Sequence, residues 1–461
     1  MLQPVRRTRD RLEPTRGLRR RRGGASLAGC TTATLLARQG LSVALLERHA
    51  GRDAYKRVCT HFIQPCGTPT LQRLGLSDAI EAVGGVRNSL DIWSQAGWVV
   101  GRHHRPNGEC AYGYTIRREK LDPMLRALAA ETPGVDLLPG LTVKRLSSER
   151  GRINGLVAHG RDRSERGIRA RLVVGADGRG STVAGLAGVR PRTIENRRFL
   201  YYAYFRDLRL ASAPAGQMWF AEPDVAYAYP CDDGLTLVAC ALRRDRLEAF
   251  KAAPESEFAR VFANLPEAPA LEGSERVSPL IGKLDMPNAH RPAAAAGVAF
   301  TGDAAMAADP MWAVGCGWAL QSAEWLADHA GPALAGEGKL DRALSRYRRL
   351  HRRRLLAHHL ACASYSSGRR LLPHERLFLS AGVYDPVTAN RLAGFGERMI
   401  GVHDIFSPRS GCGRCGHVRS RDPSGASQWR AHARRLGTTQ RGKRPSRGSV
   451  EQHLRGRRPP S

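Results

Sequence analysis

Two glycine-rich turns each place an aspartate directly after a short apolar run. The sequence GADG at 175–178 follows the run at 171–174, and the sequence GD at 302–303 follows the run at 297–301. A glycine turn at the carboxyl end of a buried strand lets the backbone approach a phosphate or a ring closely, and the adjacent carboxylate can accept hydrogen bonds from hydroxyl groups. These turns predict two parts of a ligand-binding site.

A third motif lies near the amino terminus and has the spacing of a dinucleotide fingerprint. Residues 24–29 read GASLAG, with glycines first and last and Ser26 at the position of a middle glycine. Glu47 follows this turn after about 20 residues, the spacing of a carboxylate that binds a ribose hydroxyl. Each motif alone is weak evidence, because glycine–aspartate turns are common. Their order along one chain carries more weight.

Helices and buried strands must bring these motifs together. Residues 24–40 have the composition of a turn and a helix that ends at a glycine, and residues 41–47 form an apolar run typical of a parallel strand. Residues 199–243 alternate aromatic or β-branched runs with Pro, Gly and Asp turns, which predicts an antiparallel sheet. A helix is expected at 71–83, a buried strand at 168–175, and a long helical region at 317–366 that Pro332 and Gly336 interrupt. We therefore predict an α/β fold in which one domain is assembled from discontinuous segments around an inserted sheet.

The excess positive charge is concentrated at the two ends of the chain. The 461 residues carry 73 Lys plus Arg against 42 Asp plus Glu, a formal net charge of +31. Residues 1–22 hold nine arginines, and residues 406–461 hold fourteen basic residues in a setting rich in Gly, Pro and Ser. Such composition predicts a disordered tail. No recognisable nucleic-acid-binding motif accompanies the charge, so nucleic acid is not an expected partner.

Cysteine usage and hydropathy restrict the class of protein further. The ten cysteines show no disulfide-like spacing, which indicates reduced thiols and a cytoplasmic location. The pair Cys412 and Cys415 supplies only two ligands, so no metal site is predicted. No window approaches the roughly 18 apolar residues of a membrane-spanning helix, and no transmembrane segment is expected.

Taken in order, the motifs resemble one family. GASLAG at 24–29, the pair Glu47-Arg48, Arg118 followed by LD at 121–122, and the turns at 175–178 and 302–303 resemble the flavoprotein monooxygenases of the para-hydroxybenzoate hydroxylase fold. That superfamily also contains geranylgeranyl reductases and flavin-dependent halogenases. The resemblance spans roughly residues 23–400.

The resemblance implies a discontinuous Rossmann-like FAD-binding domain with an inserted antiparallel β-sheet substrate domain and a C-terminal helical region. The implied segments are a basic atypical N-terminal segment at 1–22, the first parts of the FAD-binding domain with some substrate-domain elements at 23–190, the antiparallel sheet at 191–290, the Gly-Asp segment of the FAD-binding domain at 291–330, C-terminal helices at 331–405 and the basic tail at 406–461.

The resemblance also implies roles for individual residues. The glycines of the first turn would bring a helix start to the FAD pyrophosphate, Glu47 would bind the adenosine ribose, and Asp303 would hold the ribityl chain. The residues assigned to FAD in this way are Gly24, Gly29, Glu47, Arg48, Arg118, Asp177, Gly178, Gly302, Asp303, Pro310, Gly315 and Gly317.

No acid–base pair stands out for catalysis. His61 and Trp312 are the candidates for residues near the flavin ring. The antiparallel sheet offers an aromatic surface to the substrate, made of Tyr202, Trp219, Tyr227 and Tyr229. The resemblance implies NAD(P)H as electron donor, O₂ as co-substrate and a small organic molecule as substrate. The oligomeric state is left open.

Three departures from the family pattern are visible. Arginines at 19–22 stand where the family has a buried strand, and each unpaired buried charge would cost on the order of several kcal/mol. Met306 and Ala319 stand where aromatic hydroxylases carry His and Asn. The paired tryptophans and the lysine of the halogenases are absent, so halogenation is the least favoured chemistry.

Three hypotheses about function follow. The first is an FAD-dependent oxidoreductase that carries out NAD(P)H-driven monooxygenation of a small organic substrate. The second is an FAD-dependent reductase of C=C bonds in an isoprenoid or other lipid. The third is a non-catalytic, basic protein associated with nucleic acid or membranes, built on a degenerate flavoprotein scaffold.

Overall fold

The computed structural model describes residues 24–51, 53–105 and 107–405. The expectations for the basic segment at 1–22, for the tail at 406–461 and for the pair Cys412 and Cys415 lie outside these residues. Within them, no helix is both long enough and apolar enough to cross a bilayer.

The predicted parallel strands form two separate small sheets. Strand β1 pairs in parallel with β7, and β11 pairs in parallel with β20, which β19 extends in the antiparallel direction. Strand β20 is fully buried, whereas β1 and β7 are only partly covered, since Ala44 and Asp136 are exposed. Their bounds are β1 Val43–Glu47, β7 Val135–Pro139, β11 Val173–Gly175, β19 Ala294–Ala295 and β20 Val298–Phe300.

A cavity of about 600 Å³ separates these two sheets. Residues 42–46 line one side and residues 172–174 the other, and Ala33 of α1 (Leu27–Ala37) lies between them. Among the described residues, no strand pairs with the edge of β1 or of β11 that faces this cavity. Gly24 also lines the cavity, so the chain leaves the described region beside the gap. The sequence had placed arginines directly before this glycine, where the family carries a strand.

The antiparallel sheet, in contrast, is continuous over seven strands. Its order is β17-β13-β16-β15-β14-β4-β5, and all neighbours are antiparallel except β14 and β4. Two of these strands come from the first part of the chain, before the segment predicted to hold the sheet. The bounds are β4 Leu90–Ser94, β5 Gly97–Val99, β13 Arg198–Arg206, β14 Gly216–Ala221, β15 Asp224–Pro230, β16 Leu235–Arg243 and β17 Ile281–Lys283.

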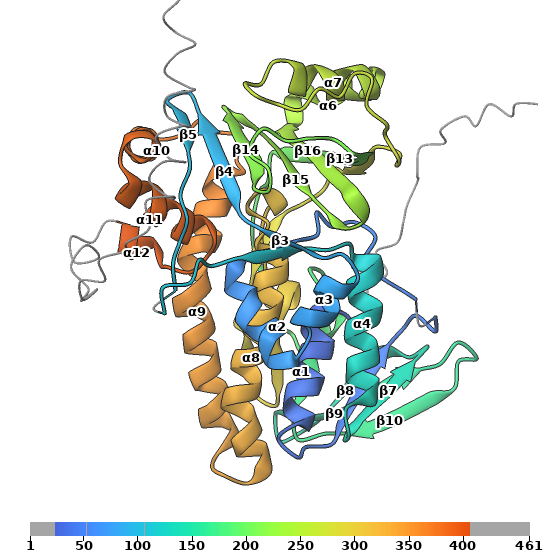
Figure 1. Ribbon diagram of the computed structural model, residues 1–461. Helices are drawn as coiled ribbons and strands as arrows, with labels where there is room; N and C mark the ends of the chain where they lie inside the picture. The colour runs from blue at the N-terminus through green and yellow to red at the C-terminus, as the bar shows by residue number, and fades with distance from the viewer. Residues whose placement is uncertain (1–23, 52, 106, 406–461) are drawn as a thin grey trace, which may run out of the picture. The chain divides into compact units, whose positions relative to one another are not determined.

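Both faces of this sheet are buried, which its alternating residues explain. Trp219 points to the face covered by α6 (Leu247–Ala252) and α7 (Pro254–Ala263) and packs with Phe262 of α7. Tyr227 and Tyr229 belong to a second cluster on the other face, which also contains Met311. Figure 1 shows α6 and α7 lying across the outer side of the sheet.

Long helices cover the parallel strands. Helix α8 packs against α1 and against α9, and the predicted break in the long helical region falls at Gly336, whose φ of 112° ends α8. Pro332 is accommodated inside the last turn of α8. The helices not bounded so far are α2 Thr68–Leu74, α3 Ser77–Ala82, α4 Arg118–Glu131, α5 Thr182–Leu186, α8 Val314–Ala335, α9 Leu340–Tyr365, α10 Pro373–Tyr384, α11 Pro386–Gly396 and α12 Val402–Ile405.

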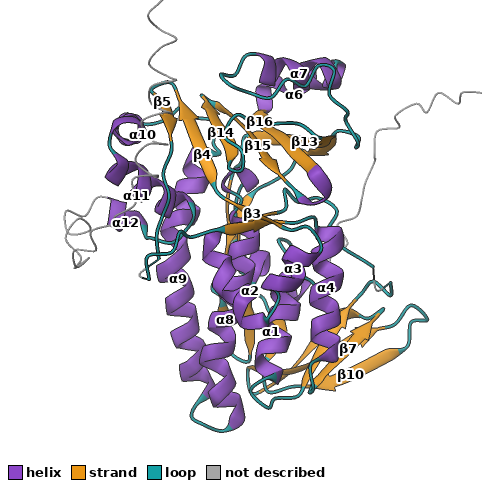
Figure 2. Cartoon of the chain, in the orientation of Figure 1, coloured by secondary structure: helices purple, strands orange, loops and turns teal. Residues whose placement is uncertain are grey.

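Three further small sheets complete the described chain, and Figure 2 shows β10, which belongs to one of them, at the lower right of the view. Their orders are β2-β6-β3, β10-β9-β8 and β12-β18-β21. The bounds are β2 Phe62–Ile63, β3 Val86–Asn88, β6 Gly113–Thr115, β8 Thr142–Glu149, β9 Arg152–His159, β10 Glu165–Arg169, β12 Arg192–Ile194, β18 Asn288–His290 and β21 Met306–Ala307.

The expected strand at 168–175 is two strands in the structure. Its first residues extend β10, which pairs with β9, and its last residues form β11. Ala170 separates them by donating its N–H to the carbonyl of Asn154. The apolar pattern was continuous across this point, so it could not reveal that the chain changes sheets there.

Candidate cofactor site

A cavity of about 430 Å³ collects most of the residues that the motifs predicted. This volume falls in the range of cofactor and small-molecule sites. The cavity is bounded by the starts of α1 and α8 and by the ends of β1 and β11. The predicted residues in its lining are Glu47, Arg48, Arg118, Asp177, Gly178, Asp303, Pro310 and Gly315. The other four, Gly24, Gly29, Gly302 and Gly317, do not line this cavity.

The glycines of the first turn make tight backbone packing possible. A Cβ atom on Gly29 would stand 1.8 Å from the carbonyl oxygen of Gly24, and a Cβ on Gly24 would stand 2.4 Å from that of Leu46. Neither contact can be relieved by a side-chain movement, because backbone atoms oppose both. The turn therefore needs glycine at these two positions to bring α1 against β1.

Ser26, at the third position of the fingerprint, is part of a buried polar cluster. Its hydroxyl accepts from Nη2 of Arg118 at 2.6 Å and lies 3.4 Å from Oδ1 of Asp122. Nε of Arg118 donates to the same Asp122 oxygen at 2.8 Å. Arg118 is only 2% exposed; burial acts to lower its pKa, but Asp122 together with the nearby sulfurs of Cys59 and Cys316 raises it. A serine thus replaces the middle glycine without breaking the turn, since it anchors the arginine.

Glu47 lies where the fingerprint predicts, at the end of β1, and is buried. One carboxylate oxygen accepts from the backbone N–H of Ala25 at 2.9 Å, and the other accepts from that of His49 at 2.9 Å. These bonds fix the carboxylate across the start of α1. Each oxygen has a second lone pair, which could accept from a ribose hydroxyl.

Asp303 reaches the cavity from the turn after β20. Its Oδ2 lies 3.4 Å from Nζ of Lys56, and a Cβ on Gly315 would stand 3.8 Å from its other oxygen. Burial would raise the pKa of Asp303, but Lys56 and Arg179 outweigh it and the pKa is lowered. The side chain is therefore a carboxylate, the form that accepts hydrogen bonds from hydroxyl groups.

The start of α8 forms a second wall. Ala313 adopts φ 50° and ψ 28°, so the chain enters the helix sharply after the turn that begins at Pro310. Buried Asp309 stabilises that turn by accepting from the N–H of Met311 at 2.7 Å. Gly317 has a packing role, since a Cβ there would stand 2.7 Å from the sulfur of Cys66.

Asp177 and its turn are used differently. The Asp177 carboxylate accepts from the hydroxyl of Ser181 and from the backbone N–H of Thr182 and Val183, which caps the start of α5. Gly178 has φ 81°, a conformation that favours glycine. This turn lines the cavity, as a contact with the cofactor would require. The Asp177 carboxylate, however, is already occupied as a cap of the start of α5.

The chemistry of this cavity fits FAD. The starts of α1 and α8 both reach it, and neither N-cap residue accepts a side-chain capping hydrogen bond. Uncapped helix starts offer backbone N–H groups and a partial positive charge to a phosphate or to an electron-rich ring. The hydroxyl oxygen of Thr301, which also lines the cavity, is buried without a hydrogen-bond partner in the described structure. The cavity thus contains carboxylates that can accept hydrogen bonds from hydroxyl groups and helix N-termini that can bind an anion.

The two catalytic candidates lie beside this cavity but do not line it. The Nδ1 atom of His61 accepts from the backbone N–H of Arg118 at 2.9 Å, and Nε2 pairs with the hydroxyl of Tyr204. Burial lowers the pKa of His61, so the ring is neutral with its proton on Nε2. The carbonyl of Trp312 accepts from Gln64 at 2.6 Å, and its side chain faces a separate small cavity.

This small cavity, of about 40 Å³, adjoins the cofactor cavity, and Phe62 and Ala313 line both. Most of its lining is apolar, and the antiparallel sheet contributes Leu90, Ile92, Met218, Tyr227 and Tyr229 to it. Glu397 is the exception. It is 7% exposed, its Oε2 has no hydrogen-bond partner in the described structure, and burial raises its pKa to about 8.

Several residues of the site belong to none of the sequence motifs described above. Lys56 and Cys59 lie in an irregular segment without a motif, and Glu397 follows α11, far from any glycine turn. The ion pair between Arg118 and Asp122 could have been predicted, because Asp122 stands four residues after Arg118 and such residues are neighbours on one helix face.

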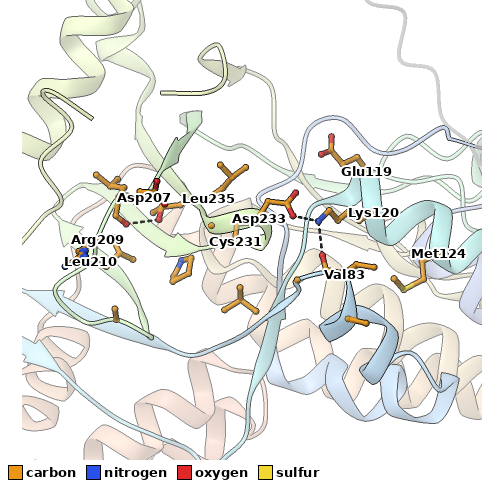
Figure 3. A pocket seen from close by; sticks show the side chains of 18 of the residues that line it. Val83, Glu119, Lys120, Met124, Asp207, Arg209, Leu210, Cys231, Asp233 and Leu235 are labelled. Atoms are coloured by element: carbon orange, nitrogen blue, oxygen red, sulfur yellow. Dashed lines mark hydrogen bonds and ion pairs between the residues drawn. The ribbon is translucent and has the colours of Figure 1, made fainter. Parts of the chain in front are cut away.

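A larger hollow, of about 1360 Å³, lies elsewhere and holds none of the predicted residues. Figure 3 shows Lys120 in its wall, pointing to Asp233 and to the carbonyl of Val83, at 2.7 and 2.8 Å. This hollow separates α4 from the loop before β16. Lys120 and Asp233 in its lining are paired with each other, and none of the cofactor motifs reaches it, so its size alone does not make it the candidate site.

Comparison with known proteins agrees with this geometry. The model of the FAD binding domain family matches residues 24–363. A probable electron transfer flavoprotein-quinone oxidoreductase, YgcN of Escherichia coli K12, is 34% identical over 173 residues, which cover 37% of this chain and 38% of the relative. The chain thus spans well under half the length of that relative.

Two further similarities extend over more of the chain. Digeranylgeranylglycerophospholipid reductase 2 of Methanothermobacter thermautotrophicus is 25% identical over 358 residues, covering 72% of this chain and 82% of the relative. The crystal structure of p-nitrophenol 4-monooxygenase PnpA from Pseudomonas putida superposes with a TM-score of 0.65 at 21% identity, covering 83% and 99% of the two chains. The chain belongs to the FAD binding domain family and has the para-hydroxybenzoate hydroxylase fold.

Proposed function

We propose that the chain is an NAD(P)H-driven monooxygenase that oxidises a small organic substrate held against the antiparallel sheet. The observation that carries this proposal is that the cavity lined by the FAD motifs adjoins the small apolar cavity beside the antiparallel sheet, which at about 40 Å³ would have to widen to admit a substrate. Their shared wall at Phe62 and Ala313 would bring a substrate next to the cofactor. The similarity of the fold to p-nitrophenol 4-monooxygenase supports the same reading.

Each wall has a definite task in this proposal. The starts of α1 and α8 and the Asp303 carboxylate would hold FAD, which when bound takes a hydride from NAD(P)H and passes electrons to O₂. The buried aromatic residues of the sheet would exclude water from the substrate. Neutral Glu397 can donate a hydrogen bond, so the favoured substrate is apolar with one polar acceptor group.

The experiment compares NAD(P)H oxidation by the purified, FAD-loaded protein with and without O₂. Candidate substrates would be phenols and other small aromatic compounds, and ¹⁸O₂ would label the product if oxygen is inserted. Substrate-dependent turnover that needs O₂, together with label in the product, supports the proposal. Substrate reduction at an undiminished rate under strict anaerobiosis contradicts it.

A C=C reductase is the second candidate, favoured by the similarity to the digeranylgeranylglycerophospholipid reductase over most of both chains. Met306 and Ala319, which replace the His and Asn of aromatic hydroxylases, agree with this alternative. The anaerobic arm of the same experiment, run with an isoprenoid alcohol, tests it directly. The third hypothesis, a non-catalytic basic protein on a degenerate flavoprotein scaffold, is tested by the visible spectrum of the purified protein, since absence of flavin absorbance after FAD addition would favour it.

A further inference from the structure

Two cysteines face each other in the wall of the cofactor cavity. The sulfur of Cys59 lies 3.9 Å from that of Cys316, although 257 positions separate the two residues in the sequence. Both line the cavity, and both are free thiols. Cys59 lies in an irregular segment before β2, whereas Cys316 lies in the first turn of α8.

The surroundings of Cys59 favour a thiolate. Its sulfur accepts the backbone N–H of His61 at 3.3 Å, and Nη1 of Arg118 lies 4.0 Å away. The hydrogen bond with Cys316 lowers the pKa of Cys59 well below its ordinary value, and the positive charges of Arg118 and Lys56 act in the same direction against burial. The same hydrogen bond, together with burial, raises the pKa of Cys316. One sulfur is thus prepared as a nucleophile and the other as its protonated partner.

We propose that Cys59 and Cys316 form a reversible, peroxide-sensitive redox pair that controls exchange of the cofactor. A disulfide needs a sulfur–sulfur distance of about 2.05 Å, so the two sulfurs must approach by about 2 Å. The irregular segment at 53–60 can supply this movement, because it contains neither helix nor strand. This inference depends on the cavity holding FAD and not on the substrate or on the use of O₂.

The chemistry balances with hydrogen peroxide as the oxidant. The Cys59 thiolate attacks one oxygen of the peroxide, the O–O bond breaks, and hydroxide leaves a sulfenic acid on Cys59. The Cys316 sulfur then attacks the Cys59 sulfur, the S–O bond breaks, and the second hydroxide leaves as the disulfide forms. Protons from the Cys316 thiol and from solvent convert both hydroxides to water. Two electrons from the pair have reduced one peroxide, and an external dithiol reverses the step.

The disulfide would join two walls of the cavity. It would tie the segment at 53–60, which carries Lys56 opposite Asp303, to the start of α8. With this segment fixed, FAD could neither enter nor leave readily. We therefore expect the oxidised protein to exchange FAD at least tenfold more slowly than the reduced protein.

The test uses the full chain loaded with FAD and treated with hydrogen peroxide. Peptide mapping by mass spectrometry without reductant should find the Cys59 and Cys316 peptides joined, and dithiothreitol should release them. Cys316→Ser should instead leave Cys59 as a sulfenic acid that a dimedone probe captures. Cys110→Ser, which removes an exposed cysteine outside the cavity, is the matched control and should still form the linked peptide.

The second measurement is the rate at which FAD dissociates. It is followed by the change in FAD fluorescence in the presence of an excess of a flavin-free apoprotein that captures the released FAD. Slowing by tenfold or more in oxidised wild type, absent in oxidised Cys316→Ser, supports the proposal. Failure to find the linked peptide at peroxide doses that oxidise Cys110 would overturn the redox pair. An unchanged rate in protein shown to carry the disulfide would overturn the control of exchange. Because the FAD and thiol measurements need no substrate, neither result depends on the proposed monooxygenation.

Discussion

The antiparallel and the parallel β regions of this molecule differ in how completely their strands are paired and packed. The antiparallel region joins seven strands into one sheet and covers both faces with side chains and helices. The parallel region, which carries the cofactor motifs, consists of two short sheets with a cavity of about 600 Å³ between them. The antiparallel region is thus closely packed, while the parallel region depends on glycine turns, helix starts and long-range polar contacts.

The largest effect should come from the packed region. Trp219 is fully buried between the sheet and α7, so Trp219→Ala should cost about 3–5 kcal/mol of unfolding free energy. Trp219 does not line the cofactor cavity, so the FAD dissociation constant of the folded fraction should be unchanged. Chemical denaturation and FAD titration measure the two quantities. A selective loss of FAD affinity without loss of stability would contradict the comparison.

The cofactor region should be most sensitive at its backbone contacts. Gly29→Ala places a methyl group on the carbonyl of Gly24, so we expect a loss of about 3 kcal/mol of stability and at least a tenfold loss of FAD affinity. Gly185→Ala is the matched control. A Cβ there meets no atom within 4 Å inside α5, and the change should be neutral or stabilise by up to about 1 kcal/mol. Equal behaviour of the two variants would remove the special role of the first turn.

Glu397 is the titratable exception in the apolar wall beside the sheet. Its pKa in the folded protein is about 8, above the ordinary 4.5, so the folded state binds the proton more tightly than the unfolded state. Stability is therefore fully present below about pH 4.5 and is lost as the pH rises through 8, by about 2 kcal/mol between pH 6 and 8. Glu397→Gln should remove this part of the pH dependence of unfolding. A wild-type profile that stays parallel to that of the variant over this range would show that Glu397 is ionised.

The smallest expected change in stability comes from enlarging an alanine beside the cavity, compared with enlarging one inside the packed sheet. Ala33 lines the gap between the parallel sheets, so Ala33→Leu should be tolerated or should stabilise by about 1 kcal/mol as its added carbons fill space. Ala239, fully buried in β16, is the counterpart, and Ala239→Leu should destabilise by about 1–3 kcal/mol through overpacking. Melting temperatures compare the pair. If Ala33→Leu destabilises as much as Ala239→Leu, the gap closes in solution.

The sequence predicted the parts of the fold that depend on neighbouring residues. The turns at 175–178 and 302–303 follow buried strands as expected, because glycine and aspartate act within a few positions. The helix expected at 71–83 is instead divided into α2 and α3 at Gly75, whose φ of 78° ends the first helix. That glycine was visible in the sequence, but its conformation was not.

Contacts between distant residues could not be predicted in the same way. Lys56 meets Asp303, and Cys59 meets Cys316, only because the folded chain brings the segment before β2 to the start of α8. No spacing rule connects such positions. The position of Trp312 beside the apolar cavity is of the same kind, since it depends on how the turn after Asp309 is held.

The uncapped starts of α1 and α8 have a thermodynamic consequence. A missing N-cap usually costs a helix about 1 kcal/mol, whereas α5 avoids this cost with its own Asp177 and Ser181. A phosphate or a flavin ring at these two starts would act as the absent cap. Folding and cofactor loading are then linked equilibria, in which part of the stability of the native state is supplied only when FAD is bound.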